Sequence, residues 1–329
     1  MKPFFSIIVP AYNAEMYLDR CVDSIINQNF DQYEIVIIDD GSIDSTSKIA
    51  KQLMNKHSNI RLVTKENGGV ASARNQGIKY SQGEYLVFLD ADDELSSNSL
   101  IDAYNGIKKY DLPDVLVCDT YVEKTSKGEF VNCLFKDINY QNLSVTQTKM
   151  SVQNISSMCI GIYNRNFLLM NDLFVKEKIT IGEDTDFFFR CLLNSKDIHI
   201  ISCNLFVYNE NSMSVTHNIS YQNIKDILSV CIDRTKDLLE NSYNDIDFDK
   251  AMNFFASKFI HFGIKSVDCD RCQKDELIRL MKTNRYILSY VKSKPDRVYS
   301  LLVGILGEHF ACCIFNSLVK IRNKVFSGE

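Results

Sequence analysis

The chain has 329 residues, of which 45% are hydrophobic and 24% are charged, and its net charge is −5. This composition is typical of a folded soluble protein and excludes a disordered chain, and the length allows two domains. Residues 277–329 hold nine Lys and Arg against three Asp and Glu, so this end carries +6 and the remainder −11. A basic end suits phosphates or an anionic membrane surface, whereas no nucleic-acid partner is expected, because the basic residues form no recognisable binding module.

Strands and helices are predicted to alternate along the first part of the chain. Continuous apolar runs predict strands, and apolar residues at helical spacing predict helices. The expected strands are 4–10, 34–38, 59–64, 85–89 and 114–119, and the expected helices are 17–26, 45–57, 70–80 and 98–110. This alternation predicts an α/β, Rossmann-like, mostly parallel sheet flanked by helices, with its ligand at the carboxyl ends of the strands.

The turn after the first strand argues against a nicotinamide cofactor. A dinucleotide-binding protein would have G-x-G-x-x-G at this position, and residues 11–14 contain no glycine.

The strand at 85–89 runs directly into four acidic side chains, Asp90, Asp92, Asp93 and Glu94. Crowded carboxylates repel one another unless a cation lies among them, and Mg²⁺ and Mn²⁺ prefer oxygen ligands of this kind. Asp90-Ala91-Asp92 is therefore interpreted as a metal site. The alternative is a solvated acidic turn that caps the following helix.

The second half of the chain is less regular. Residues 121–157 have weak periodicity and are expected to form a long excursion that shapes an acceptor pocket. Gly182-Glu-Asp-Thr-Asp186 opens an apolar helix at 187–193, and its acidic first turn would be favoured by the helix dipole in any case. A final strand is expected at 198–207, and from Tyr221 onward the pattern is helical. The predicted domains are 1–215 and a helical C-terminal region, 216–329.

Eleven cysteines without a recognisable secretory signal predict reduced thiols and a cytoplasmic location. Cys269 and Cys272 have the spacing of zinc ligands, but the sequence offers no second pair, so free thiols are expected.

Residues 298–319 are apolar apart from Glu308 and His309, with basic residues on both sides. Two apolar runs interrupted by a charge are too short to span a bilayer. One interpretation is a helix that lies at the inner face of the cell membrane, and the other is a packed helical hairpin or homodimer contact.

Five motifs carry a family resemblance. They are Ser6-Ile-Ile-Val-Pro-Ala-Tyr-Asn13, Val36-Ile-Ile-Asp-Asp-Gly-Ser42, Asn67-Gly-Gly-Val-Ala-Ser-Ala-Arg-Asn75, Gly83-Glu-Tyr-Leu-Val-Phe-Leu-Asp-Ala-Asp-Asp93 and Gly182-Glu-Asp184. Together they resemble family 2 glycosyltransferases of the GT-A fold, over residues 1–215. The resemblance implies an inverting transfer from a nucleotide-diphosphate sugar, with a UDP-sugar expected, to a glycan or lipid-linked acceptor in surface polysaccharide synthesis.

The resemblance also implies a role for each matched residue. Base and ribose would be held by Asp39, Asp40 and the turn Pro10, Ala11, Tyr12 and Asn13, with Arg74 and Asn75 near the nucleotide. Asp90 and Asp92, with Ala91 between them, would hold a Mn²⁺ or Mg²⁺ ion that bridges the two phosphates. Asp184 would be the general base, with Glu183 its neighbour. Apart from the resemblance, His217 is a candidate third metal ligand, and the alternative is a surface or packed histidine.

Two departures from the family pattern bear on the acceptor. Many relatives have Trp and Lys where this chain has Cys159-Ile-Gly-Ile-Tyr163, and many have an Arg where Asn209 follows Tyr208. An unusual acceptor is therefore expected. The rival interpretations are a metal-dependent phosphotransferase or phosphatase with a nucleophilic D-x-D, and a non-catalytic scaffold that binds sugar nucleotides.

Overall fold

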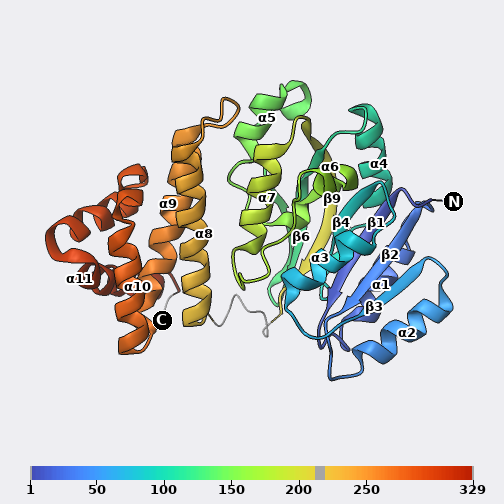
Figure 1. Ribbon diagram of the computed structural model, residues 1–329, viewed down its shortest axis with the longest axis horizontal. Helices are drawn as coiled ribbons and strands as arrows, with labels where there is room; N and C mark the ends of the chain where they lie inside the picture. Colours follow the sequence, from blue (N-terminus) through green and yellow to red (C-terminus); the bar gives the residue numbers. More distant parts are fainter. Residues whose placement is uncertain (1, 212–218, 328–329) are drawn as a thin grey trace. The chain divides into compact units, whose positions relative to one another are not determined.

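The computed structural model describes residues 2–211 and 219–327, and the side chains only as far as residue 317. The chain divides into two compact units, one of residues 1–178 with 183–214 and the other of residues 179–182 with 215–329. Figure 1 shows strands only in the first unit and helices throughout the second. All eleven cysteines are free.

The first half of the chain has the predicted alternation of strands and helices. The elements are β1 (Phe5–Ala11), α1 (Leu18–Ile26), β2 (Tyr33–Asp39), α2 (Thr46–Lys56), β3 (Ile60–Thr64), α3 (Val70–Tyr80), β4 (Tyr85–Phe88) and α4 (Ser99–Lys109). Every residue of β1, β2 and β4 is buried, as expected for parallel strands covered on both faces.

The sheet itself is mixed. Its strand order is β3-β2-β1-β4-β8-β6-β9-β5, and β7 (Gly128–Cys133) pairs with β6. The first four strands are parallel, but β8 (Gly161–Asn164) is antiparallel to both β4 and β6 (Val115–Thr125). β6 pairs in parallel with β9 (Ile198–Asn209), and the short β5 (Glu94–Leu95) joins the edge of β9. The GT-A type of α/β sheet is confirmed, but three short strands, β5, β7 and β8, pair antiparallel with their neighbours, which the sequence did not predict.

Residues 121–157 are more regular than expected. β6 continues to Thr125 and returns as β7 (Gly128–Cys133), so the predicted strand end at residue 119 is wrong. The hairpin was missed because its residues are polar and half-exposed, without a clear alternation. After it come η1 (Tyr140–Asn142), α5 (Val145–Val152), η2 (Met158–Ile160) and α6 (Arg165–Met170).

Close packing of α3 against β1 fixes the depth of this helix. A Cβ atom on Gly77 would lie 2.2 Å from Cγ2 of Ile8, so only glycine allows the two elements to approach this closely. The small residues Ala71, Ser72 and Ala73 precede Arg74 and Asn75 on this helix, and all five are buried. The helix α7 (Glu183–Asn194) is anchored by its three buried phenylalanines, Phe187 to Phe189.

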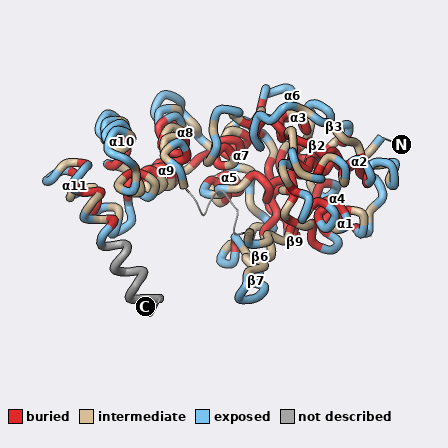
Figure 2. The backbone as a smooth tube through the Cα atoms, turned by 90° about the horizontal axis from the view of Figure 1, so that it is seen from below, coloured by how far each residue is buried: buried red, intermediate tan, exposed pale blue. Residues whose placement is uncertain are grey.

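The second unit consists of helices, as predicted. They are α8 (Tyr221–Glu240), α9 (Phe248–Ile264), η3 (Lys265–Asp268), α10 (Arg271–Thr283), η4 (Arg285–Tyr290) and α11 (Lys294–Ser327). Figure 2 shows buried residues along α8 and α9, whereas α10 and α11 have many exposed positions. α11 is not continuous, because Gly307 has a φ of 77° and breaks it.

Candidate active site

The polar ends of three parallel strands meet at one edge of the sheet. In register, Ala11 of β1 lies beside Asp39 of β2, and Ile8 lies beside Phe88 of β4. The backbone continues this contact beyond the strands, because Asp40 N–H donates to the Ala11 carbonyl. Residues 10–13, 39–40 and 89–93 are therefore neighbours, as the parallel arrangement predicts.

Asp40 organises the loop between β3 and α3. Its carboxylate accepts hydrogen bonds from the Gly68 N–H at 3.0 Å and the Gly69 N–H at 2.7 Å, and it pairs with the Lys65 ammonium. Asp40 is buried. The structure thus gives Asp40 an internal role, and its predicted contact with the base stays a prediction.

The turn after β1 is tied to the turn after β2. Asn13 has a φ of 48°, and its side-chain oxygen accepts from the Ile43 N–H at 3.0 Å. Asp39 accepts from the Ser42 N–H at 3.0 Å. Tyr12 follows the end of β1 and is half-exposed, and an accessible aromatic residue at this position suits stacking on a base.

Arg74 joins two acidic segments that are far apart in the sequence. Its Nη2 lies 2.9 Å from Asp90 Oδ1 at the end of β4, and its Nη1 lies 2.6 Å from Asp184 Oδ1 and 3.0 Å from Glu183 Oε1 in the first turn of α7. The guanidinium is almost completely buried. A single positive charge therefore serves three carboxyl groups, and two negative charges remain if all three are ionised.

The excess negative charge is reflected in the pKa values. Burial and the Asp184 charge raise the pKa of Glu183, although Arg74 opposes them, so Glu183 is the group that retains a proton. The pKa of Asp184 is also raised, by burial first and by the Asp90 charge, while Arg74 and a side-chain hydrogen bond with Glu183 oppose this rise. Asp184 is therefore the better proton acceptor of the pair at neutral pH.

The turn after β4 carries further uncompensated charge. Burial and then Asp90 raise the pKa of Asp92, and the same two causes raise the pKa of Asp93 to about 8. The turn is held from outside by Arg20, which donates to the Asp92 carbonyl at 2.6 Å and pairs with Glu94 at 3.2 Å.

The end of β9 lies against this turn. The Asn209 N–H donates to Asp93 Oδ1 at 2.9 Å, and the Asn211 amide donates to Asp92 Oδ2 at 3.3 Å. A pocket of about 200 Å³ opens here, lined by Tyr17, Arg20, Asp92, Asn209, Glu210 and Asn211.

Asp90 and Asp92 fit a divalent ion by their chemistry. Both are carboxylates on one turn, Asp90 raises the pKa of Asp92, and a cation between them would relieve that repulsion. Within the part of the chain that the structure describes, no three His, Cys, Asp or Glu side chains gather to hold an ion by themselves. Mg²⁺ bound by one or two carboxylates and substrate phosphates needs no such group. The third predicted ligand, His217, lies outside the described residues.

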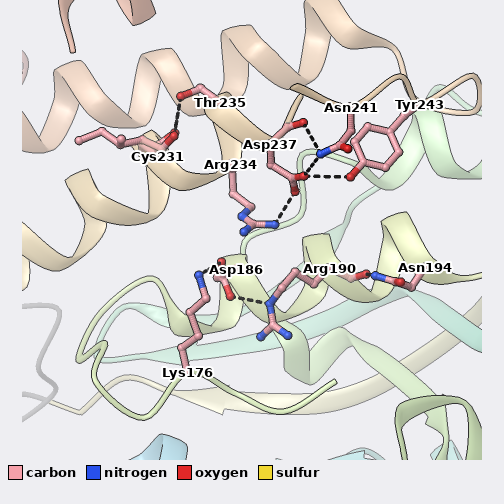
Figure 3. A network of polar contacts seen from close by, with 11 residues as sticks. Lys176, Asp186, Arg190, Asn194, Cys231, Arg234, Thr235, Asp237, Asn241 and Tyr243 are labelled. Atoms are coloured by element: carbon pink, nitrogen blue, oxygen red, sulfur yellow. Dashed lines mark hydrogen bonds and ion pairs between the residues drawn. The ribbon is translucent and has the colours of Figure 1, made fainter. Parts of the chain in front are cut away.

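Asn75 holds the segment that precedes α7. Its side-chain oxygen accepts from the Val175 N–H, its amide donates to the Val175 carbonyl, both at 2.8 Å, and it reaches Glu177 at 3.1 Å. The same segment is bound on its other side by Arg190, which donates to the Phe174 carbonyl at 2.6 Å and to Asp186 at 2.7 Å. Figure 3 shows Asp186 between Arg190 and Lys176.

Sequence reasoning missed four polar residues of the site. Arg20, Lys65, Asn209 and Asn211 bind the acidic turns, and only Asn209 had been singled out, as a departure from a family pattern. Nothing in their spacing marks them, because they come from three separate parts of the chain: α1, the loop after β3, and the end of β9. The segment with Cys159 and Tyr163 forms η2 and β8, where Tyr163 donates to the Met158 carbonyl at 2.8 Å.

Comparison with known proteins identifies relatives of this arrangement. A sequence profile described as glycosyl transferase family 2 matches residues 6–167. An uncharacterized glycosyltransferase of Haemophilus influenzae is 30% identical over 202 residues, which are 59% of this chain and 74% of that protein. The uncharacterized glycosyltransferase EpsJ of Bacillus subtilis is 29% identical over 224 residues, 66% of this chain and 64% of that protein.

Other relatives carry names from cell-wall synthesis. The minor teichoic acid biosynthesis protein GgaB of B. subtilis is 31% identical over 55% of this chain and 20% of its own length. The crystal structure of residues 1–349 of Staphylococcus aureus TarS with UDP-GlcNAc superposes with a TM-score of 0.76 at 21% identity, covering 96% of this chain and 91% of that one. At this identity the superposition shows a common fold.

Proposed function

The chain belongs to glycosyl transferase family 2, and on this premise we propose that it is an inverting, metal-dependent glycosyltransferase of surface polysaccharide synthesis. Its donor is a nucleotide-diphosphate sugar. UDP-GlcNAc is the first donor to test, because the superposed S. aureus structure contains it. The acceptor is a hydroxyl group of a glycan or of a lipid-linked precursor, which agrees with the names of the cell-wall relatives.

One observation carries the proposal. The Arg74 guanidinium binds two carboxylates through two different nitrogens. Nη1 binds Asp184, the expected base, and Nη2 binds Asp90, which is expected at the diphosphate end of the donor. The residues that would act on the acceptor and on the leaving group are thus held in one fixed arrangement, although 94 positions separate them in the sequence. Fixed placement of reacting groups is a large part of catalysis.

In the proposed reaction the acceptor hydroxyl oxygen attacks the anomeric carbon of the donor sugar. The new glycosidic bond forms as the bond to the diphosphate oxygen breaks on the opposite face, so the configuration inverts. Asp184 takes the hydroxyl proton, and the bond electrons leave with the diphosphate. Arg74 keeps Asp184 oriented and opposes the rise that burial causes in the pKa of Asp184, which favours the ionised form that accepts the proton.

Asp90 and Asp92 would hold the divalent ion. When bound, such an ion neutralises the charge that develops on a departing diphosphate. Asn211 and Arg20 orient Asp92 and its backbone for this purpose, by the contacts to its carboxylate and carbonyl.

The test is release of UDP from UDP-sugars in the presence of Mn²⁺ and a glycan acceptor. Asp184→Asn should leave UDP affinity nearly unchanged and lower turnover on the order of a hundredfold or more. Asp249→Asn is a matched control, because Asp249 also lies in the first turn of a helix, α9, and is exposed. Release of inorganic phosphate without a glycoside, or full activity of Asp184→Asn, would refute the proposal.

A further inference from the structure

The exposed side chains of α11 between residues 298 and 314 are apolar apart from His309. Six of them are large, and we call them the α11 ridge: Val298, Leu301, Ile305, Leu306, Phe310 and Ile314. Leu301, Ile305 and Phe310 are 64%, 69% and 63% exposed. Scattered exposed apolar residues are normal, but a continuous run of them indicates a contact surface.

The ridge lies on two short helical segments. In the described part of the chain one helix, Lys294–Ser317, is long and apolar enough to cross a membrane by length and composition, and 28% of its most apolar stretch is buried. The left-handed backbone at Gly307 divides the helix, and the uncharged runs on either side, 298–306 and 309–319, are each shorter than the roughly 20 residues that a span requires. Each segment packs one face inward, through Tyr299 and Val303 before the break and Ala311 and Cys312 after it.

The one acidic residue between residues 298 and 317 is buried and does not belong to the ridge. Glu308 is buried, and its carboxylate accepts from Arg285 at 2.7 Å and 2.6 Å. Asp296, at the start of α11, is half-buried and accepts from Ser257 at 2.6 Å. No Asp or Glu is therefore exposed between residues 297 and 317, although the sequence alone placed a charge in the middle of the apolar run.

The charges beside the ridge are positive. Lys294 and Arg297 are exposed at its beginning. The sequence continues beyond it with Lys320, Arg322 and Lys324, whose side chains are outside the described part. Exposed cations beside exposed apolar side chains are complementary to a lipid bilayer, which has anionic headgroups at its surface and apolar acyl chains beneath them.

From the ridge, the buried Glu308 and the basic flanks, we propose that α11 docks on the surface of a lipid bilayer that contains anionic lipid. The apolar side chains enter the boundary between headgroups and acyl chains, and Lys294 and Arg297 meet the headgroup phosphates. The two segments lie along the surface, because the break at Gly307 and the short uncharged runs on either side of it do not allow a span. This binding depends on the second unit alone and does not rest on the proposed transferase activity.

The experiment is flotation of the full chain with phosphatidylglycerol vesicles and with phosphatidylcholine vesicles. The ridge variant Leu301→Asn/Ile305→Asn/Phe310→Asn is compared with Ile43→Asn/Val131→Asn/Met170→Asn, whose three positions are apolar, are 88%, 66% and 86% exposed, and lie in the first unit. A third variant, Lys294→Gln/Arg297→Gln, tests the charge. Sedimentation measures the oligomeric state of each protein, and the midpoint of thermal unfolding shows whether it is folded.

We expect the unmodified chain to float with phosphatidylglycerol and much less with phosphatidylcholine. The ridge variant should lose binding on the order of tenfold or more, and the charge variant and high salt should both weaken it, while the control variant binds normally. Absence of flotation, equal binding to both lipids, or equal loss in ridge and control variants would overturn the proposal. If the unmodified chain forms a dimer and binds no vesicles, and only the ridge variant is monomeric, the ridge is a contact with a second copy of the chain and the membrane proposal is wrong. If the ridge variant fails to fold, the charge variant and the salt dependence test the proposal instead, and vesicle binding that neither of them weakens would overturn it.

Discussion

Replacing Arg74 with methionine tests the charge balance on which the candidate site depends. Methionine keeps much of the volume of the side chain but removes the guanidinium that contacts Asp90, Glu183 and Asp184. Removing one partner of a buried ion pair costs about 3–5 kcal/mol, because the other charge is left buried without compensation. We assign most of this loss to Asp184, since Glu183 can retain a proton and the Asp90 side chain is 37% exposed, where pairs contribute about 0–1 kcal/mol.

The loss of folding stability in Arg74→Met should depend on pH. Without Arg74 the pKa of Asp184 and of Glu183 rises further in the folded state, so the folded variant binds more protons than the unfolded chain. Stability from a raised pKa is present at low pH and is lost as pH rises through the folded-state value. The destabilisation relative to the unmodified chain should therefore be larger at about pH 8 than at about pH 5.

Urea unfolding followed by tyrosine fluorescence measures this difference, because the chain has no tryptophan. Arg20→Met is the control, since its pair with Glu94 is half-exposed and its loss should cost about 0–1 kcal/mol. A cost below about 1 kcal/mol for Arg74→Met at the higher pH, or a cost that is the same at both pH values, would contradict the charge argument.

Two further predictions concern the metal and the segment before α7. Asp92→Asn should abolish the effect of Mn²⁺ on UDP affinity, and calorimetry with and without EDTA measures it; a metal effect that survives the substitution would assign the ion to other ligands. Asn75→Ala removes both hydrogen bonds to Val175, so opening of this segment should become easier by about 1–3 kcal/mol. Hydrogen exchange at the Val175 amide reports it, and unchanged protection there would show that Arg190 holds the segment alone.

The sequence by itself determined the alternation of strands and helices in the first half of the chain. Parallel strands that are covered on both faces are apolar throughout, so 5–11, 33–39 and 85–88 are visible as continuous runs. Carboxylates directly after such runs must lie at the edge of the sheet, so the positions of Asp39, Asp40 and Asp90 could also be predicted. These are local properties, and they need no knowledge of distant contacts.

Tertiary structure alone decided how the strands are ordered and which charges meet. β8 is four residues long and becomes a strand only because β4 and β6 lie on either side of it. Arg74 and Asp184 are 110 positions apart, and neither spacing nor composition shows that one guanidinium binds both ends of the site. The same is true of Glu308, which divides an apolar run in the sequence and is removed from its surface in the fold by Arg285. Each of these contacts joins separate elements of the fold. Its free energy therefore cannot be inferred from the sequence of any one segment.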